Sequence, residues 1–296
     1  MTTATKATYK LIKKIKSDKF NVDNLQHYTL LLNVGVRDFQ VSIVDTNNNA
    51  CLLLEDYVLA SIQSNAQLLE VLAQIFEEHH FLMAGFWKSV KIAFKNNKFS
   101  LVPSSLFVKD ALEDYLKINC QVDAEKEEFL YYKNIRSGAV TVFAVNKELY
   151  SWLSSVYKNA EVGFIHQSCV LTEGVLNARK SYGKKSVFLY IDRFKIHIVT
   201  LKGKTLEYYN QFPIKQFSDY IKYIMLVMKG LGYDQKTCNV VLWGYIGKQS
   251  PHYNEFYKYI KNISFGDRPE FLKFDYPFDE VQDHHFFDLY NAYLCD

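Results

Sequence analysis

The sequence has few cysteines, and none of them lies in a C-x-x-C pair. The five are Cys51, Cys120, Cys169, Cys238 and Cys295. An odd number cannot all pair within one chain, and regular spacings of the kind that mark a disulfide framework are missing. The pattern is typical of a protein from a reducing compartment, and it predicts buried free thiols.

Long apolar runs are missing as well. The longest, near Ile224–Met228, is far too short to span a bilayer. The N-terminus lacks the apolar stretch of a signal peptide. Charged residues make up 23% of the chain and the mean hydropathy is -0.15. These features predict a cytoplasmic protein without a membrane span.

The motifs of common enzyme classes do not occur. The chain contains no Gly-x-Ser-x-Gly, His-Glu-x-x-His, Walker loop or six-residue Rossmann fingerprint. His79 and His80 are adjacent, and adjacent helical residues point about 100° apart, so they chelate one metal poorly. His284 and Asp288 are four residues apart, but two ligands make a poor site. We therefore predict no catalytic residue and no metal site.

Net charge is small but unevenly placed. The chain carries +3, whereas residues 1–20 hold six lysines and one aspartate, a local +5. The remaining chain, at +3 minus +5, carries −2. We interpret residues 1–20 as a basic tail that is solvated and partly disordered, with weak binding to RNA as the alternative. A near-neutral body argues against broad nucleic-acid binding.

A repeated motif is the most informative feature present. Residues Tyr28–Tyr57 and Ser186–Phe212 each predict three short strands joined by tight turns. The matching cores are Asp38–Val44 and Arg193–Val199, which alternate polar and apolar residues. Each unit then runs into a long amphipathic helix. A duplicated unit of this kind predicts a two-lobed fold.

The repeat suggests where the lobes divide. We place a first lobe at residues 21–182 and a second at 183–296, because a polar, glycine-containing stretch begins near Tyr182. The alignment of the two motifs pairs Phe39 with Phe194. The run Val240–Trp243 is apolar on both faces, which predicts a central strand covered by helices on both sides. A final helix near Val281–Leu294 is expected to seal the core of the second lobe, with a docking face as the alternative.

Duplicated meanders followed by helix-linked strands resemble the actin-like ATPase superfamily, which includes actin, Hsp70, sugar kinases and pilus-assembly ATPases. The segment Val140–Leu176 looks like the corresponding stretch of the pilus-assembly members. Together with the closing segment Asp283–Tyr290 and Cys295, the meander is similar to an uncharacterised bacterial family of unknown function. The resemblance implies a mixed α/β fold class: a duplicated, two-lobed, ribonuclease H-like architecture with no established activity.

The resemblance also implies two phosphate-binding hairpins, each with an aspartate and turn glycines that let backbone N–H groups approach phosphate oxygens. The first hairpin retains Gly35 and Arg37 but has Asn33 where a carboxylate is expected. A neutral amide is a poor Mg²⁺ ligand. The second hairpin keeps Asp192, lacks a turn glycine, and has Phe194, which we expect to point into the sheet.

The adenosine-binding turn departs from the pattern too. A strand followed by two adjacent glycines is expected, whereas here Gly244 is followed by Tyr245, and the next glycine is Gly247. Tyr245 stands where the nucleotide would pass. These vestigial positions predict a catalytically degenerate pseudo-ATPase without a cofactor that binds or scaffolds an unknown protein partner. Two alternatives are an ATP-binding protein with non-standard phosphate contacts and an RNA- or ribosome-associated factor that uses the basic N-terminus.

Overall fold

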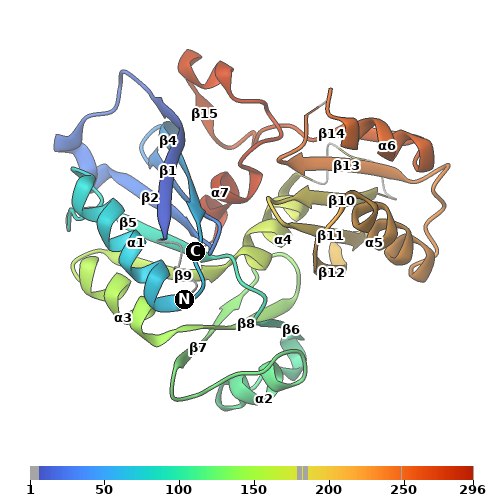
Figure 1. Ribbon diagram of the computed structural model, residues 1–296, viewed down its shortest axis with the longest axis horizontal. Coiled ribbons are helices and arrows are strands. Elements are labelled where there is room, and N and C mark those ends of the chain that lie inside the picture. The colour runs from blue at the N-terminus through green and yellow to red at the C-terminus, as the bar shows by residue number, and fades with distance from the viewer. Residues whose placement is uncertain (1–6, 179–181, 183–185, 248, 296) are drawn as a thin grey trace, which may run out of the picture.

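The computed structural model describes residues 7–178, 182, 186–247 and 249–295. Two large mixed sheets face each other, and a small third sheet lies beside them (Figure 1). The fold is therefore of the mixed α/β class, as the sequence predicts.

The first large sheet has seven strands. Its core is the antiparallel meander β2 (Tyr28–Val34), β3 (Asp38–Asp45) and β4 (Ala50–Ala60). The order along the sheet is β1-β4-β3-β2-β5-β9, and the short β15 also pairs with β4. The remaining strands are β1 (Thr8–Lys16), β5 (Ser89–Phe94), β9 (Glu161–His166) and β15 (Lys273–Phe274).

The second large sheet repeats this arrangement with five strands. Its order is β12-β11-β10-β13-β14, so a meander is again followed by a parallel strand next to its first member. The strands are β10 (Ser186–Ile191), β11 (Lys195–Lys202), β12 (Thr205–Pro213), β13 (Asn239–Gly244) and β14 (Asn262–Phe265). The segment order β12-β11-β10-β13 matches β4-β3-β2-β5 of the first sheet.

The structural register of the two hairpins corrects the sequence alignment. Val34 pairs with Phe39 at the end of the first hairpin, and Ile191 pairs with Ile196 at the end of the second. Phe39 therefore corresponds to Ile196, and the predicted match of Phe39 with Phe194 is wrong by two residues. Phe194 lies in the turn and is 49% exposed, so it does not point into the sheet. Alternating patterns fix strand faces but allow such two-residue slips.

Helices cover both faces of each large sheet. In the second sheet, Val240 and Leu242 pack in the core beneath α5 (Phe217–Gly230) and α6 (Pro251–Tyr259). Val241 and Trp243 pack in the core on the α4 (Gln167–Ala178) side. The predicted two-sided burial of this strand is confirmed. In the first sheet, Phe39 packs against Phe76 of α1 (Asn65–Glu78), and Phe76 in turn packs against Trp152 of α3 (Lys147–Val156).

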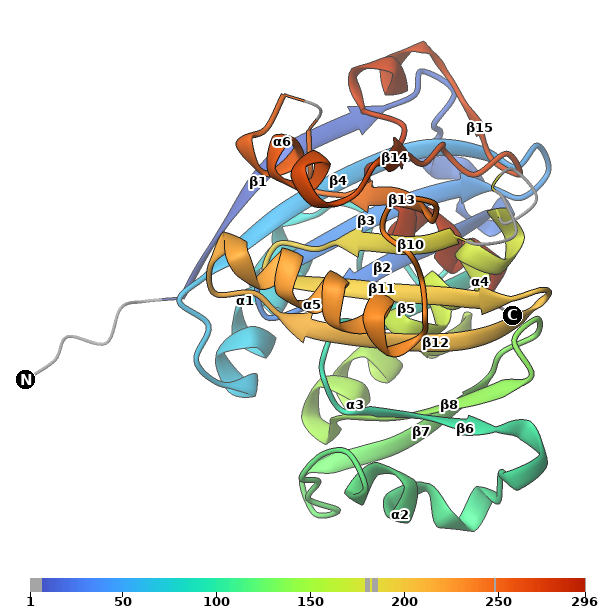
Figure 2. The same ribbon diagram turned by 90° about the vertical axis from the view of Figure 1, so that its right-hand side faces the viewer.

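The third sheet forms a separate small layer below the second (Figure 2). Its order is β6-β8-β7, with α2 (Leu112–Lys117) packed on one face. The strands are β6 (Phe99–Pro103), β7 (Glu127–Lys133) and β8 (Ala139–Asn146). Short 3-10 helices occupy Val22–His27, Ser104–Leu106, Lys109–Ala111, Tyr276–Glu280 and Ala292–Leu294.

Most of the C-terminal segment packs on the first sheet, which contradicts the expectation that it seals the second lobe, although Phe287 stacks on Trp243 of the second sheet. The helix α7 (Phe287–Asn291) is short: Phe286, with a left-handed φ of 55°, interrupts the predicted long helix immediately before α7 begins. Leu289 and Tyr290 belong to the core of the first sheet. On α4, Gly174 permits a close approach to α7: a Cβ there would lie 2.6 Å from Asn291.

The basic N-terminal segment is also ordered where the structure describes it. Residues 8–16 form β1, which pairs antiparallel with β4 at the edge of the seven-stranded sheet. Ile15 is buried, and Lys14 forms an ion pair of 2.8 Å with the buried Glu55. Beyond the strand, Ser17 donates to Asp275 at 2.7 Å. The expectation of a disordered tail is wrong for these residues.

Candidate functional site

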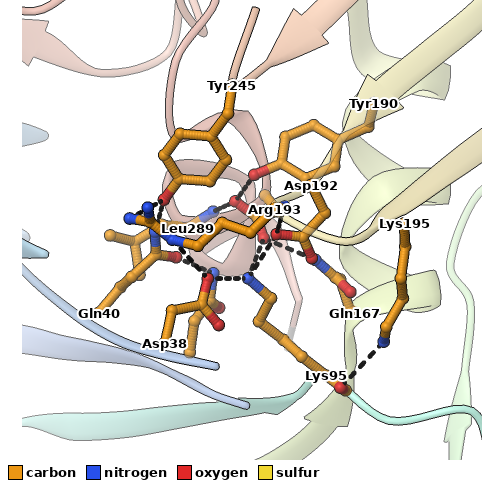
Figure 3. Close-up of polar contacts among 12 residues, drawn as sticks. Asp38, Gln40, Lys95, Gln167, Tyr190, Asp192, Arg193, Lys195, Tyr245 and Leu289 are labelled. Carbon is orange, nitrogen blue, oxygen red and sulfur yellow. Dashed lines mark hydrogen bonds and ion pairs between the residues drawn. The ribbon is translucent and has the colours of Figure 1, made fainter. Parts of the chain in front are cut away.

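The two hairpin turns face each other across the gap between the large sheets. In the first turn the Gly35 N–H donates to the Asp38 carbonyl at 3.0 Å, and in the second the Asp192 N–H donates to the Lys195 carbonyl at 2.9 Å. Backbone hydrogen bonds also hold the residues that directly follow the parallel strands β5 and β13. The Lys95 N–H donates to the Val34 carbonyl, and the Tyr245 N–H donates to the Ile191 carbonyl. The side chains of Asp38, Lys95, Asp192 and Tyr245 therefore converge (Figure 3).

Lys95 lies at the centre of this convergence. Its Nζ is 2.6 Å from Asp38 Oδ2, 3.1 Å from Asp192 Oδ1 and 3.9 Å from Asp288 Oδ2. The lysine side chain is only 3% exposed. A buried ammonium is tolerated when carboxylates surround it. The contacts join three regions of the chain, namely the first hairpin, the second hairpin and α7.

A second cation, the partly buried Arg193, bridges the same gap. It donates to Asp56 Oδ2 at 2.6 Å, and its Nε lies 3.6 Å from Asp38 Oδ2. The guanidinium lies over the Tyr245 ring, 4.2 Å from its centroid. The Tyr245 hydroxyl also accepts a hydrogen bond from the Gln40 amide. Arg193 thus fastens the second hairpin, and Tyr245 fastens the end of β13, to strands β3 and β4 of the first sheet.

Helix α4 and the C-terminal segment complete the cluster. Gln167 Nε2 donates to Asp192 Oδ2 at 3.1 Å and to Asp288 Oδ2 at 2.8 Å. The Tyr190 hydroxyl donates to Asp288 Oδ1 at 2.5 Å. We call these residues the interlobe ion cluster. Its members are Asp38, Gln40, Asp56, Lys95, Gln167, Tyr190, Asp192, Arg193, Tyr245 and Asp288.

The carboxyl groups of the cluster differ in acidity. Burial raises the pKa of Asp38 to about 6, although Lys95 opposes the shift. Burial also raises the pKa of Asp288. For Asp192, burial acts in the same direction, but Lys95 and His197 outweigh it, so its pKa lies well below the usual range. The pKa of Lys95 is raised because its carboxylate neighbours outweigh its burial.

The three nucleotide-site positions predicted in the first hairpin lie in different environments in the structure. Asn33 is fully buried in β2 and donates from Nδ2 to Gln40 Oε1 at 3.0 Å, so it adjoins the cluster. Gly35 lies beneath Asp38, since a Cβ at this position would be 2.7 Å from Asp38 Oδ1. Arg37 stays at the surface, where its guanidinium lies 4.8 Å from the centroid of the Phe194 ring.

The nucleotide-site positions predicted in the second sheet also lie in different environments. Asp192 and Tyr245 belong to the cluster. Gly244 has φ 95°, and a Cβ there would be 2.1 Å from the Ile191 carbonyl oxygen, so the close backbone approach requires glycine. Gly247 instead lines a cavity of about 880 Å³ together with Tyr253, Asp267, Asp283 and His284, among others.

Several members of the cluster were not identified from the sequence. Asp38, Asp56, Lys95, Gln167 and Asp288 are distant in sequence, and the motifs that contain Asp38, Asp56 and Asp288 assign them no role in this cluster. The available signal was that Lys95 directly follows the apolar strand Val90–Phe94.

The pairing of His284 with Asp288 as metal ligands is not realised: His284 contacts the Ile246 carbonyl, whereas Asp288 contacts Gln167. Among the described residues, no group of three or more His, Cys, Asp or Glu is arranged to hold a metal ion.

Solved structures of other proteins match over nearly the whole chain. A protein with actin-like ATPase fold and unknown function from Bacteroides thetaiotaomicron is 22% identical, with a TM-score of 0.76; the match covers 94% of this chain and 99% of that one. The PilM-PilN type IV pilus biogenesis complex matches at 14% identity and a TM-score of 0.63, covering 90% and 97%. Both likenesses show the fold, which is actin-like as predicted.

EutJ, an ethanolamine utilization protein from Carboxydothermus hydrogenoformans, matches more distantly, at 11% identity and a TM-score of 0.45 over 95% and 93% of the two chains. No curated protein matches the chain. Within the described residues, no helix is long and apolar enough to cross a membrane. A family model described as "Protein of unknown function (DUF3822)" matches residues 17–263. The chain belongs to this family of unknown function, as its resemblance to an uncharacterised family predicts.

Proposed function

We propose that this protein is an actin-like binding or scaffold protein that does not hydrolyse ATP. The observation that carries the proposal is the interlobe ion cluster, in which Lys95 is buried between carboxylates of both hairpins. The cluster lies where the two hairpin turns meet. These ion pairs fill the space between the hairpins, and their role in this proposal is to hold the two lobes together.

The residues present do not fit a nucleotide phosphate. The space above Gly35 is occupied by the Asp38 carboxylate, which would repel a phosphate. The turn amides of Gly35 and Asp192 already donate to carbonyls within their own turns, and the Arg193 amide donates to the Asp192 side chain at 2.8 Å. Phosphate cradles depend on free backbone N–H groups. The Tyr245 ring adds bulk at the same place.

A binding role is supported by the fold and by one neighbour. PilM, which has this fold at a TM-score of 0.63, was solved in a complex with PilN. We infer that this chain likewise works through a protein partner. The five cysteines are free thiols, which supports a reducing, cytoplasmic location. We further infer that the matching strand orders of the two large sheets arose by internal duplication.

Thermal unfolding with and without Mg-ATP tests the proposal. A ligand present at about 100 times its Kd stabilises a protein by about 2.7 kcal/mol, which gives an easily measured rise in Tm. We expect ATP, ADP and GTP with Mg²⁺ to leave the Tm unchanged, and we expect no release of phosphate. A dose-dependent rise in Tm that the Gly247→Trp variant abolishes would instead support nucleotide binding.

That second candidate rests on one observation. The cavity of about 880 Å³ next to Gly247 is large enough for a nucleoside, and Gly247 belongs to the predicted adenosine-binding turn. Its lining includes Asp267 and Asp283, which disfavour an anionic ligand. We therefore rank ATP binding with non-standard contacts second. The Gly247→Trp arm distinguishes the two candidates, because a Cβ at Gly247 has no atom within 4 Å and the variant should fold.

A further inference from the structure

A groove of about 690 Å³ separates the small sheet from the second large sheet. One wall is β6 and the other is β12, and each is the edge strand of its own sheet (Figure 2). The ring of Phe99 meets the ring of Tyr209 edge to face, with centroids 5.7 Å apart, where the two walls approach. The groove therefore runs between two strand edges that belong to different sheets.

An edge strand carries backbone N–H and C=O groups along one side that no neighbouring strand pairs. Extended peptides bind such edges by adding a strand, with alternate side chains seated in adjacent pockets. On β6, Phe99 and Leu101 line the groove, whereas Ser100 turns the other way and donates to the Tyr115 carbonyl at 2.8 Å. The alternation presents apolar side chains to an occupant that runs along the strands.

The lining is rich in amides and carries positive charge. Among the described residues that line the groove there are two lysines, Lys95 and Lys195, and neither Asp nor Glu. Five side-chain amides surround them, from Asn96, Asn97, Asn119, Asn210 and Gln211. Amides can donate to and accept from a peptide backbone. The positive charge favours an occupant with carboxylates.

Lys195 is the cation of this lining that no carboxylate of the described residues contacts, although Asp192 and Asp38 attract it from further away and burial lowers its pKa. Its Nζ donates to the Lys95 carbonyl at 3.1 Å and lies 3.5 Å from Gln211 Oε1. Both of these partners are neutral oxygens, so a carboxylate that enters the groove would gain an ion pair. Lys95, in contrast, is already surrounded by carboxylates. Gln211 also donates to the Asn96 carbonyl at 2.7 Å, which joins β12 to the turn after β5.

We propose that this groove binds an extended, acidic segment of a partner protein, which adds as a strand along β12 with a carboxylate next to Lys195. The inference rests on the proposed binding function and specifies where the partner docks and what its chemistry is. Backbone pairing along the strand edge would supply affinity, and the lysine with its amides would select acidic over basic segments.

Selection from a displayed library of random twelve-residue peptides tests this proposal on the full chain. Peptides enriched on the wild type are synthesised with a fluorescent label and titrated by anisotropy. The test variant is Asn97→Asp/Asn210→Asp, which adds two charges at exposed, nearly isosteric positions in the groove. The control variant is Asn159→Asp/Asn254→Asp, which makes the same change of charge at exposed positions outside the groove lining.

We expect enrichment of acidic peptides whose affinity falls at least about tenfold in the groove variant and stays within about twofold of wild type in the control. The proposal is overturned if no peptides are enriched, if the enriched peptides are basic or neutral, or if both variants behave alike. A partner that binds elsewhere would leave the proposed binding function standing. Binding of Mg-ATP would overturn the proposed function without affecting the peptide result.

Discussion

At the residue scale, the distribution of charge in the interlobe ion cluster follows from its burial. Four aspartates, one lysine and one arginine lie close together in the gap between the sheets. Full ionisation would leave an excess of negative charge in a medium that solvates it poorly. Below about pH 6 the cluster relieves this excess by protonation of Asp38, whose pKa is raised to about 6 by burial. Asp192 remains ionised because Lys95 stabilises its charge.

The raised pKa of Asp38 predicts how stability depends on pH. The folded state binds the proton of Asp38 up to about pH 6, whereas in the unfolded chain an aspartate releases it near pH 4. Folded protein therefore holds more protons between these values, and the contribution of Asp38 to stability falls as the pH rises through this window. Asp38→Asn removes the titration. We expect the free energy of unfolding of wild type, relative to Asp38→Asn, to fall by up to about 3 kcal/mol from pH 4 to pH 6.

Urea denaturation of both proteins across this range provides the measurement. Asp45→Asn is the matched control, because Asp45 lies at the opposite end of β3 near the surface. Parallel pH profiles for wild type and Asp38→Asn would contradict the assignment of the raised pKa to Asp38.

Sequence motifs located only part of this cluster. Asp192 was found because it matches the hairpin pattern that the family resemblance implies, and Tyr245 because it interrupts the expected pair of glycines. Lys95, Gln167 and Asp288 come from other elements, and only the packing of α4 and α7 between the sheets brings them together. These side chains meet only because of the long-range topology of the fold. No spacing between neighbouring residues in the sequence indicates that they lie together.

At the element scale, β1 shows how an edge strand can resemble a disordered tail. Its lysines suggested a solvated segment, yet lysines on an edge strand also prevent unwanted pairing with other chains. The inward-facing positions include Tyr9 and Ile15, which contact the core of the first sheet. The strands Tyr28–Val34 and Asp38–Asp45 were easier to predict, because their turn is local and their apolar content is high. The residues of β4 that pair with β1, by contrast, lie 37 (Lys16 with Leu53) to 52 (Thr8 with Ala60) positions away in the sequence.

Removal of β1 should therefore weaken the fold. Deletion of residues 1–16 uncovers the edge of β4 and leaves the buried Glu55 without the ion pair to Lys14. We expect a Tm lower by several degrees and concentration-dependent aggregation, because an exposed flat edge recruits other strands. Calorimetry and size-exclusion chromatography measure the two effects. Deletion of residues 1–6 is the control and should behave as wild type; equal behaviour of both deletions would contradict a structural role for β1.

At the scale of the whole molecule, the chain leaves the first sheet, builds the second and returns. Residues 186–265 form the five-stranded sheet and its two outer helices, after which β15 and α7 pack on the first sheet. The exit and return points are adjacent, since the Tyr182 hydroxyl accepts from the Asp267 N–H at 3.0 Å. The second sheet is thus inserted into the first lobe. The lobe boundary at residue 182 therefore stays a prediction, and it concerns only the point where the chain leaves the first lobe. Most of the C-terminal segment packs in the core of the first sheet.

This topology predicts which fragments fold. Residues 7–178 alone lack β15 and α7, so the face of β2 and β3 that carries Gln40 loses its cover of Leu289 and Tyr290. We expect this fragment to be insoluble or to unfold without cooperativity. A second fragment joins residues 7–182 to 267–296 through a short Gly-Ser linker, which the adjacent ends allow. It restores that cover, and we expect it to be more soluble and to unfold cooperatively in urea. If the two fragments behave alike, the C-terminal segment is not part of the first folding unit.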